Sequence, residues 1–258
     1  AVDNKALVYL NDHFIGEHIG GYLAFSFDVT DYISNRNILR VEVSDNTDTF
    51  YPFGKQSNKP SGMWYTSISG IWKTVWMETV PTKEEIRSVK IDTTIDSIDF
   101  YVDTDNEYCI SITFDEDTLA YISKSQHLHV DLKNIKYQNW TIKHPVLYTV
   151  TIKTNYDTVQ TYVGIREIGV ETINNHKYLC LNKEPIYLNG VLDQGYFSDG
   201  IYLPKDDKEY LYDIRRMKEL GFNMLRKHIK VEDEAFYYYC DKEGMLVMQD
   251  MVNSGDVN

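Results

Sequence analysis

Charged and hydrogen-bonding side chains follow three predicted strands in the last third of the chain, each at the point where its strand ends. Asp193 and Gln194 follow the first strand, Arg226 and His228 the second, and Asp250 the third. Short carboxylates, an amide and a planar guanidinium bind hydroxyl groups through several hydrogen bonds. A histidine can donate to a hydroxyl or carry a proton. We expect these five residues to form one substrate-binding site.

Two interpretations stay open for the basic residues of this group. Arg226 can bind a substrate oxygen, or it can form a structural ion pair with Asp250 or Asp193. His228 can act on a substrate, or it can be a histidine that is merely hydrogen-bonded in a loop. No glutamate stands at any of the three strand ends, so a pair of carboxylates for general acid and nucleophile chemistry cannot be assembled from these residues.

The elements that must position these residues alternate between strand and helix. Strands are predicted to start at Tyr187, Asn223 and Leu246, which are 36 and 23 residues apart, with one helix ending before Gly221 and a second over 232–243. This spacing is typical of consecutive βα units in a parallel sheet or barrel, where ligands bind at the carboxyl ends of the strands. Two and a half units cannot close an eight-stranded barrel, so we interpret the sequence as a fragment.

The residues before this segment have the periodicity of β structure. Short strands are predicted over 6–10, 14–16, 25–27, 38–43 and 71–79, and a polar loop over 44–63 is the first candidate binding surface. After a linker at 81–85, a second series begins in which alternate residues such as Ile110, Ile112 and Phe114 share one face. We expect this series to form a sandwich of about seven strands.

Composition excludes several classes of protein. The chain has 258 residues, 43% of them hydrophobic and 25% charged, with a formal net charge of −13. Such a chain folds into a globular protein and repels phosphate backbones and anionic lipid. We expect neither a nucleic acid nor a membrane as a partner, and a homo-oligomer stays open. The cellular compartment is not determined, with the cytoplasm slightly favoured.

Neither a metal site nor a cofactor motif is predicted. The three cysteines are far apart and form no C-x-x-C pair. His127, His129 and Asp131 stand at alternate positions and could meet at one ion, but they lie opposite the apolar face of their strand, which favours a solvated sheet face. The sequence has no phosphate loop, nucleophile elbow or dinucleotide fingerprint. We expect no cofactor and no metal.

Three groups of motifs, in order along the chain, resemble glycoside hydrolase family 2. One group is similar to its sugar-binding jelly roll, one to the junction between its immunoglobulin-like domain and its barrel, and one to its second and third barrel strands. These motifs are Val8-Tyr9-Leu10-Asn11, Phe25-Ser26-Phe27-Asp28 and Gly70-Ile71-Trp72-Lys73; Val163-Gly164-Ile165-Arg166 and Leu188-Asn189-Gly190-Val191; and Lys-Glu-Leu-Gly-Phe-Asn-Met-Leu-Arg over 218–226 with Tyr239-Cys240-Asp241.

The resemblance implies a multi-domain β plus α/β chain. Its parts are an N-terminally incomplete jelly-roll β-sandwich at 1–80, an immunoglobulin-like β-sandwich at 81–168, and the first strands and helices of a (β/α)8 barrel, a TIM barrel, at 169–258. Two positions depart from the family's pattern. Arg226 is followed by Lys227-His228, where the family often has Arg-x-Ser-His, and Met251 stands where many members have Glu.

The resemblance further implies a retaining β-glycosidase that hydrolyses terminal β-linked sugars and is β-galactosidase-like. Its acid/base and nucleophile glutamates belong to the fourth and seventh barrel strands, beyond Asn258. We therefore expect no catalytic residue in this chain and no activity from it alone. The alternative is a non-catalytic carbohydrate-binding or interaction module. Metal-dependent hydrolysis on a barrel is disfavoured because Asn189-Gly190-Val191 stands where an H-x-H would be needed.

Overall fold

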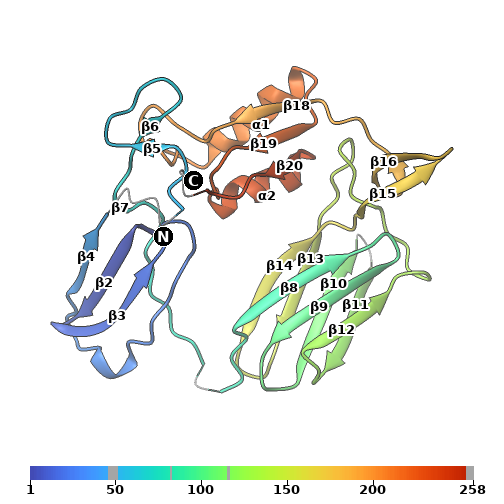
Figure 1. Ribbon diagram of the computed structural model, residues 1–258. Helices are drawn as coiled ribbons and strands as arrows, with labels where there is room; N and C mark the ends of the chain where they lie inside the picture. Colours follow the sequence, from blue (N-terminus) through green and yellow to red (C-terminus); the bar gives the residue numbers. More distant parts are fainter. Residues whose placement is uncertain (46–51, 82, 115–116, 254–258) are drawn as a thin grey trace. The chain divides into compact units, whose positions relative to one another are not determined.

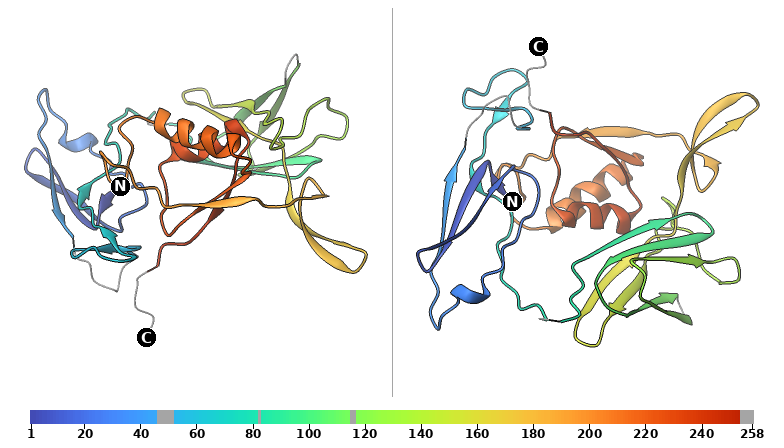
Figure 2. Two further views of the ribbon diagram at one scale, coloured as in Figure 1. Left: turned by 90° about the horizontal axis from the view of Figure 1, so that it is seen from above. Right: turned by 60° about the horizontal axis from the view of Figure 1, so that its bottom comes forward.

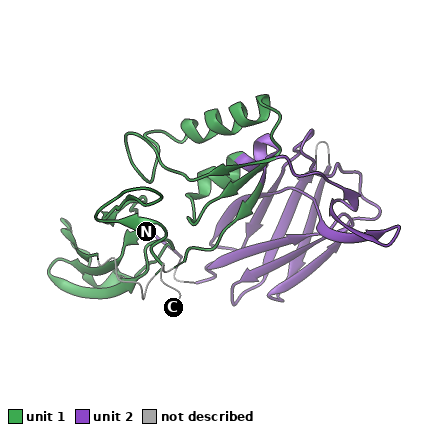
Figure 3. Cartoon of the chain, turned by 45° about the horizontal axis from the view of Figure 1, so that its top comes forward, with its two compact units in different colours: residues 1–76, 190–239, 247–258 green, residues 77–189, 240–246 purple. Residues whose placement is uncertain are grey.

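The computed structural model describes residues 1–45, 52–81, 83–114 and 117–253. The chain divides into two compact units, which Figure 3 shows in different colours. Unit 1 comprises residues 1–76, 190–239 and 247–258, and unit 2 comprises 77–189 and 240–246. Neither helix of the described residues is long and apolar enough to cross a membrane.

The first β part of unit 1 is built on a three-stranded antiparallel sheet in the order β3-β2-β4 (Figure 1). Strand β2 alternates half-buried and buried positions, and its Ala6 and Val8 form a small core with Val2. The hairpin between β2 and β3 turns at Asn11 and Asp12, both with positive φ, as a type I′ turn requires. The bounds are β1 Val2–Asp3, β2 Lys5–Leu10, β3 His13–Ile19, η1 Thr30–Tyr32, β4 Leu39–Ser44, β5 Gln56–Ser57, β6 Tyr65–Thr66 and β7 Gly70–Ile71.

Two of the predicted strands in this part are wrong. The strand expected over 71–79 shrinks to β7, because its partner β1 offers only Val2 and Asp3 for pairing. Residues 74–79 are exposed, with Trp76 at 67%. Phe25 and Phe27 lie outside the strands, where they pack on the small core as side chains. Of the loop predicted over 44–63, residues 46–51 lie outside the described residues.

Unit 2 contains the predicted seven-stranded sandwich. A three-stranded sheet, β12-β9-β8, faces a four-stranded sheet, β11-β10-β13-β14. The inward positions of β9 and β10 are completely buried, and they include Ile98, Phe100, Ile110 and Ile112. The strands are β8 Ser88–Thr93, β9 Ser97–Asp103, β10 Tyr108–Phe114, β11 Asp117–Ser123, β12 His127–Asp131, β13 Tyr148–Lys153 and β14 Thr158–Val163.

A further sheet of unit 2 follows the sandwich. It has the order β15-β16-β17, over Ile168–Ile173, His176–Leu181 and Glu184–Pro185. Ile186 donates its N–H to the Leu179 carbonyl, which keeps 184–186 in this sheet. The first strand of the last segment therefore begins at Gly190 and not at Tyr187, whose side chain is 84% exposed.

The last segment alternates strand and helix, as predicted. Strands β18 (Gly190–Asp193) and β19 (Met224–Lys227) pair in parallel, and β20 (Leu246–Gln249) lies beside β19. Both helices, α1 (Lys208–Glu219) and α2 (Glu234–Glu243), lie on the same side of this sheet in the views of Figure 2. Gly221 follows α1 with a φ of 92°, the left-handed conformation expected there. Three strands form an open sheet, so a barrel is not present in the described residues.

Candidate functional site

The carboxyl ends of β18, β19 and β20 bring four of the five predicted residues to one edge of the sheet. Asp193 is paired in register with Lys227, and the N–H groups of His228 and Asp250 donate to the carbonyls of Asp193 and Lys227 at 2.9 and 3.0 Å. The main chain of the three strand ends is therefore joined by hydrogen bonds. Gln194 follows Asp193 and is half-buried. We call Asp193, Gln194, Arg226, His228 and Asp250 the carboxyl-edge site.

Arg226 forms an ion pair within this site. Its Nε lies 3.0 Å from Oδ1 of Asp250, while half of the Arg226 side chain remains exposed. Of the two partners that the sequence left open, the structure selects Asp250 and not Asp193. The remaining N–H groups of the guanidinium can still donate to a bound hydroxyl or carboxylate, because a guanidinium carries five donors.

Asp193 is held by a lysine that the sequence analysis did not select. The Lys227 Nζ lies 3.0 Å from Asp193 Oδ1, and the Gly195 N–H donates to the same oxygen at 2.9 Å. Lys227 is almost completely buried, whereas Asp193 remains about one quarter exposed. Both interactions are made by the same carboxylate oxygen, Oδ1.

Lys227 belongs to a group of buried charges beneath the carboxyl-edge site. Lys230 and Glu232 form a close ion pair, and Glu232 also lies 3.6 Å from the Lys227 Nζ. The Lys230 Nζ donates to the carbonyls of Gly195 and Tyr202, each at 2.6 Å. Burial lowers the pKa of Lys230 to about 8, against the opposing effect of Glu232. We call Asp193, Lys227, Lys230 and Glu232 the ion cluster.

The only sequence signal for the ion cluster is the run of charges after the second strand. Lys227, Lys230 and Glu232 follow Arg226 within six residues. Such a run usually indicates a solvated face. Here all three side chains point inward, because loop 194–202 and the aromatic residues of unit 1 cover them. The run alone does not distinguish these two outcomes.

Aromatic rings surround the ion cluster within unit 1. The hydroxyls of Tyr22 and Tyr202 lie 3.1 Å apart, and the Trp72 ring makes edge contacts with both tyrosines. The Lys230 ammonium lies 4.7 Å from the centroid of the Tyr202 ring. Burial raises the pKa of Tyr22 and Tyr202, so both phenols stay protonated and act as neutral hydrogen-bonding groups.

His228 is half-buried beside the ion pair of Arg226 and Asp250. Burial, followed by the positive charge of Lys55, lowers its pKa below the usual value, with Asp250 acting in the opposite direction. A neutral imidazole is therefore favoured at pH 7. Such a ring can both donate to and accept from sugar hydroxyls.

The other candidates from the sequence lie in unit 2, and they are occupied by contacts within the protein. His127 and His129 both hydrogen-bond Oδ1 of Asp99, at 2.8 and 2.9 Å, so their common partner is Asp99 and not Asp131. The described residues contain no group of three or more His, Cys, Asp or Glu side chains that could hold a metal ion.

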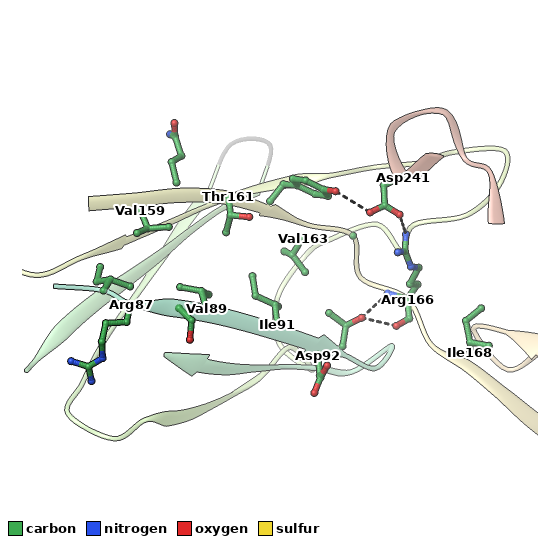
Figure 4. Close-up of a pocket in the computed structure, with 16 residues that line it drawn as sticks. Arg87, Val89, Ile91, Asp92, Val159, Thr161, Val163, Arg166, Ile168 and Asp241 are labelled. Atoms are coloured by element: carbon green, nitrogen blue, oxygen red, sulfur yellow. Dashed lines mark hydrogen bonds and ion pairs between the residues drawn. The ribbon is translucent and has the colours of Figure 1, made fainter. Parts of the chain in front are cut away.

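Unit 2 also contains a cavity. It has a volume of about 750 Å³ and opens between β8 and β14, the edge strands of the two sandwich sheets (Figure 4). At one end Arg166 pairs with Asp241 at 2.7 Å, and Asp241 also accepts from the Tyr162 hydroxyl. These charges are neutralised within the protein.

The carboxyl-edge site presents groups that hydrogen-bond to hydroxyls, and none of its five members is a glutamate. Asp193 and Asp250 already accept from Lys227 and Arg226. Glu232 is completely buried and paired with lysines, so it cannot reach a ligand. Carboxylates, a guanidinium and a neutral imidazole suit hydrogen bonding to hydroxyl groups.

Comparison with known proteins identifies relatives along almost the whole chain. A putative β-glucuronidase from Formosa agariphila is 25% identical over 97% of the chain, and a β-galactosidase from Thermoanaerobacter pseudethanolicus is 27% identical over 95%. The matches occupy 32% and 35% of these relatives, so the chain spans about a third of their length. No family model matches the chain.

Solved structures show the same fold. A β-glucuronidase from Ruminococcus gnavus superposes on 98% of this chain with a TM-score of 0.80 at 21% identity, over 44% of that structure. A β-glucuronidase from Bacteroides uniformis superposes on 98% of the chain with a TM-score of 0.74 at 23% identity, over 33% of that structure.

Proposed function

We propose that this chain, which is homologous along nearly its whole length to β-glucuronidases and β-galactosidases of the glycoside hydrolase family 2 type, is part of a retaining β-glycosidase. Its substrates are terminal β-linked sugars, with a β-galactoside as the first expectation. The proposal is carried by the main chains of three adjacent strand ends, which bring Asp193, Arg226, His228 and Asp250 to one carboxyl edge. Ligands bind at this edge of parallel α/β folds.

In this proposal the domains keep the predicted bounds of 1–80, 81–168 and 169–258. The last of them supplies the first three strands of a (β/α)8 barrel. The parallel pairing of β18 with β19 and the position of both helices on one side of the sheet support this assignment. The order β18-β19-β20 is also that of consecutive strands in such a barrel.

The carboxyl-edge site then binds the sugar next to the bond that is cleaved. Asp193 and Asp250 accept from sugar hydroxyls, Arg226 and His228 donate to them, and Gln194 can do both. The acid/base and nucleophile glutamates come from barrel strands outside this chain. The buried, paired state of Glu232 supports this division of roles, because Glu232 cannot supply either function.

Activity of the longer protein that contains this chain tests the proposal. We expect it to release the chromophore from an aryl β-galactoside or an aryl β-glucuronide, and to lose about 10²-fold or more in kcat/KM when Asp250 is replaced by Asn. Asp99→Asn, far from the site in sequence and paired with two histidines of the sandwich, is the matched control. Absence of turnover on a broad panel of aryl glycosides, together with sugar binding, would favour a non-catalytic carbohydrate-binding module.

A further inference from the structure

A hollow of unit 1 lies in the loop that was predicted from the sequence as a binding surface. It has a volume of about 350 Å³ and is formed by residues on both sides of β5. We call it the loop pocket; its lining residues are Phe53, Gln56, Ser57, Asn58, Lys59 and Trp64.

The segment that carries the loop pocket touches the chain after each of the three parallel strands. After β20, the Asn253 carbonyl accepts from the Gly54 N–H at 3.2 Å. After β19, the Ile229 carbonyl lies so close that a Cβ on Gly54 would be 3.0 Å away. After β18, the Tyr196 ring lies 4.4 Å from the Tyr65 ring, centroid to centroid. The loop pocket therefore adjoins the carboxyl-edge site within one compact unit.

Hydrogen bonds hold the base of the loop pocket in place. The buried Gln56 amide donates to Asp3 at 2.9 Å and accepts from the Ile68 N–H at 2.7 Å. Strand β5 also pairs in parallel with β6, which joins Gln56 to Tyr65. Because both sides of the loop are tied to the body of unit 1, the hollow is largely formed before a ligand binds.

The lining combines aromatic rings with polar groups that project from a turn. The Trp64 side chain is 37% exposed and Phe53 is half-buried, so both contribute aromatic surface. Ser57, Asn58 and Lys59 supply a hydroxyl, an amide and an ammonium group. An aromatic ring packs against the apolar face of a pyranose, while such polar groups bind its hydroxyls. A volume of about 350 Å³ is at the lower end of the range for ligand sites, roughly 300–1,000 Å³, which suits a single ring.

We propose that the loop pocket is a subsite for a second pyranose ring, on the leaving-group side of the bond that is cleaved. This assignment rests on the proposed function, since it takes the carboxyl-edge site as the place of the terminal sugar. Trp64 provides the stacking surface, and Lys59 with Ser57 binds the hydroxyls of the second ring. The subsite gives the protein a preference for substrates in which the leaving group is itself a sugar.

Nuclear magnetic resonance of the tryptophan indole groups tests the subsite in the 258-residue chain itself. The chain has four tryptophans, and Trp64→Phe assigns the signal of Trp64. We expect methyl β-D-glucopyranoside and lactose to shift this signal saturably, with half-saturation at about 1–10 mM, the affinity range of a weak single-site ligand. The signal of Trp76, which is exposed but outside the loop pocket, should stay unchanged. Glycerol, which has hydroxyls but no ring, should shift neither signal.

Two variants of the loop pocket and one control variant separate a loss of binding from a loss of folding. Trp64→Ala should weaken the binding of methyl β-D-glucopyranoside at least ten-fold, and Trp76→Ala should leave it unchanged. Lys59→Ala removes an exposed side chain and should weaken binding a few-fold with no change in the thermal midpoint. The proposal is overturned if no saturable shift occurs at Trp64, or if both loop variants bind as the unchanged chain does. Because this assay needs no turnover, an inactive longer protein would contradict the proposed function without affecting this result.

Discussion

Two ion pairs at the carboxyl edge differ sharply in how far their residues are exposed. Arg226 pairs with Asp250, and half of the Arg226 side chain is exposed to solvent. Lys227 pairs with Asp193 and Glu232, and the Lys227 side chain is almost completely buried. A half-exposed pair contributes little to stability, because water and salt screen both charges. Removing one partner of a buried group leaves the other charges without compensation.

Replacing Lys227 should therefore destabilise the chain far more than replacing Arg226. We expect Lys227→Met to lower the free energy of unfolding by about 3–5 kcal/mol, and Arg226→Met by less than about 1 kcal/mol. Urea denaturation of the two variants measures the difference. Equal losses would show that Lys227 is not buried as described.

Lys230 should make stability depend on pH above neutrality. Its pKa is lowered by burial to about 8 in the folded chain, below the ordinary value of 10.5. Between these values the unfolded chain binds more protons than the folded chain, so the contribution of Lys230 to stability rises with pH and is lost as the pH falls through 8. The free energy of unfolding is measured from pH 7.5 to 9.5 for the unchanged chain and for Lys230→Met. It should rise with pH in the unchanged chain, and this rise should be absent in the variant. Parallel curves would contradict the assignment.

At the scale of the elements, three glycines differ in how much space surrounds them, so substitutions there report how tightly the loops pack. Gly195 has a φ of 64°, and a Cβ there would lie 2.5 Å from a Glu232 oxygen. Gly221 has a φ of 92°, and a Cβ there would have open space. Gly169 has ordinary backbone geometry and open space.

Alanine at these three positions should therefore give graded losses. We expect Gly195→Ala to cost the most, Gly221→Ala about 1 kcal/mol from backbone strain alone, and Gly169→Ala nothing or a slight gain. Thermal unfolding of the three variants ranks them. A neutral Gly195→Ala would mean that loop 194–202 can move away from the ion cluster.

Trp140 joins the sandwich of unit 2 to the last turn of α2. Its ring is completely buried, its Nε1 donates to the Asp241 carbonyl at 2.7 Å, and the Arg166 guanidinium lies 4.4 Å from its centroid. We expect Trp140→Phe to cost about 1–3 kcal/mol, since the ring is largely kept but a buried carbonyl loses its donor. Chemical denaturation checks this, with the exposed Tyr156→Phe as the neutral control.

At the scale of the whole molecule, the proposed function divides the roles between this chain and the rest of a longer protein. In this proposal the carboxyl-edge site binds the sugar, and the acid/base and nucleophile glutamates lie outside this chain. We therefore expect the 258-residue chain to hydrolyse aryl β-galactosides and aryl β-glucuronides no faster than a blank. Chromophore release over many hours measures this, and a rate comparable to that of an intact family member would contradict the division of roles proposed above.

Much of the fold could be predicted from periodicity. The strands of the sandwich in unit 2 alternate apolar and polar residues, and each inward face is buried where the pattern predicts. The alternation of strand and helix in the last segment was also predicted from local patterns. These were the helix-ending glycine at Gly221 and the spacing between the predicted strands. The pattern failed at 71–79, where apolar residues on both faces predicted a covered strand, but pairing extends over only two residues.

The sequence by itself determined which residue types follow the three strands. It also determined that they lie at one edge of the sheet, because parallel strands place their carboxyl ends together. Only the tertiary structure decided the pairings: Arg226 with Asp250, Asp193 with Lys227, and both buried lysines with Glu232. The physical reason is that a charged side chain prefers solvent unless a partner is held within a few ångströms. The partner residues and loop 194–202, which covers them, belong to different segments of the chain. The sequence does not specify how close these segments come in space.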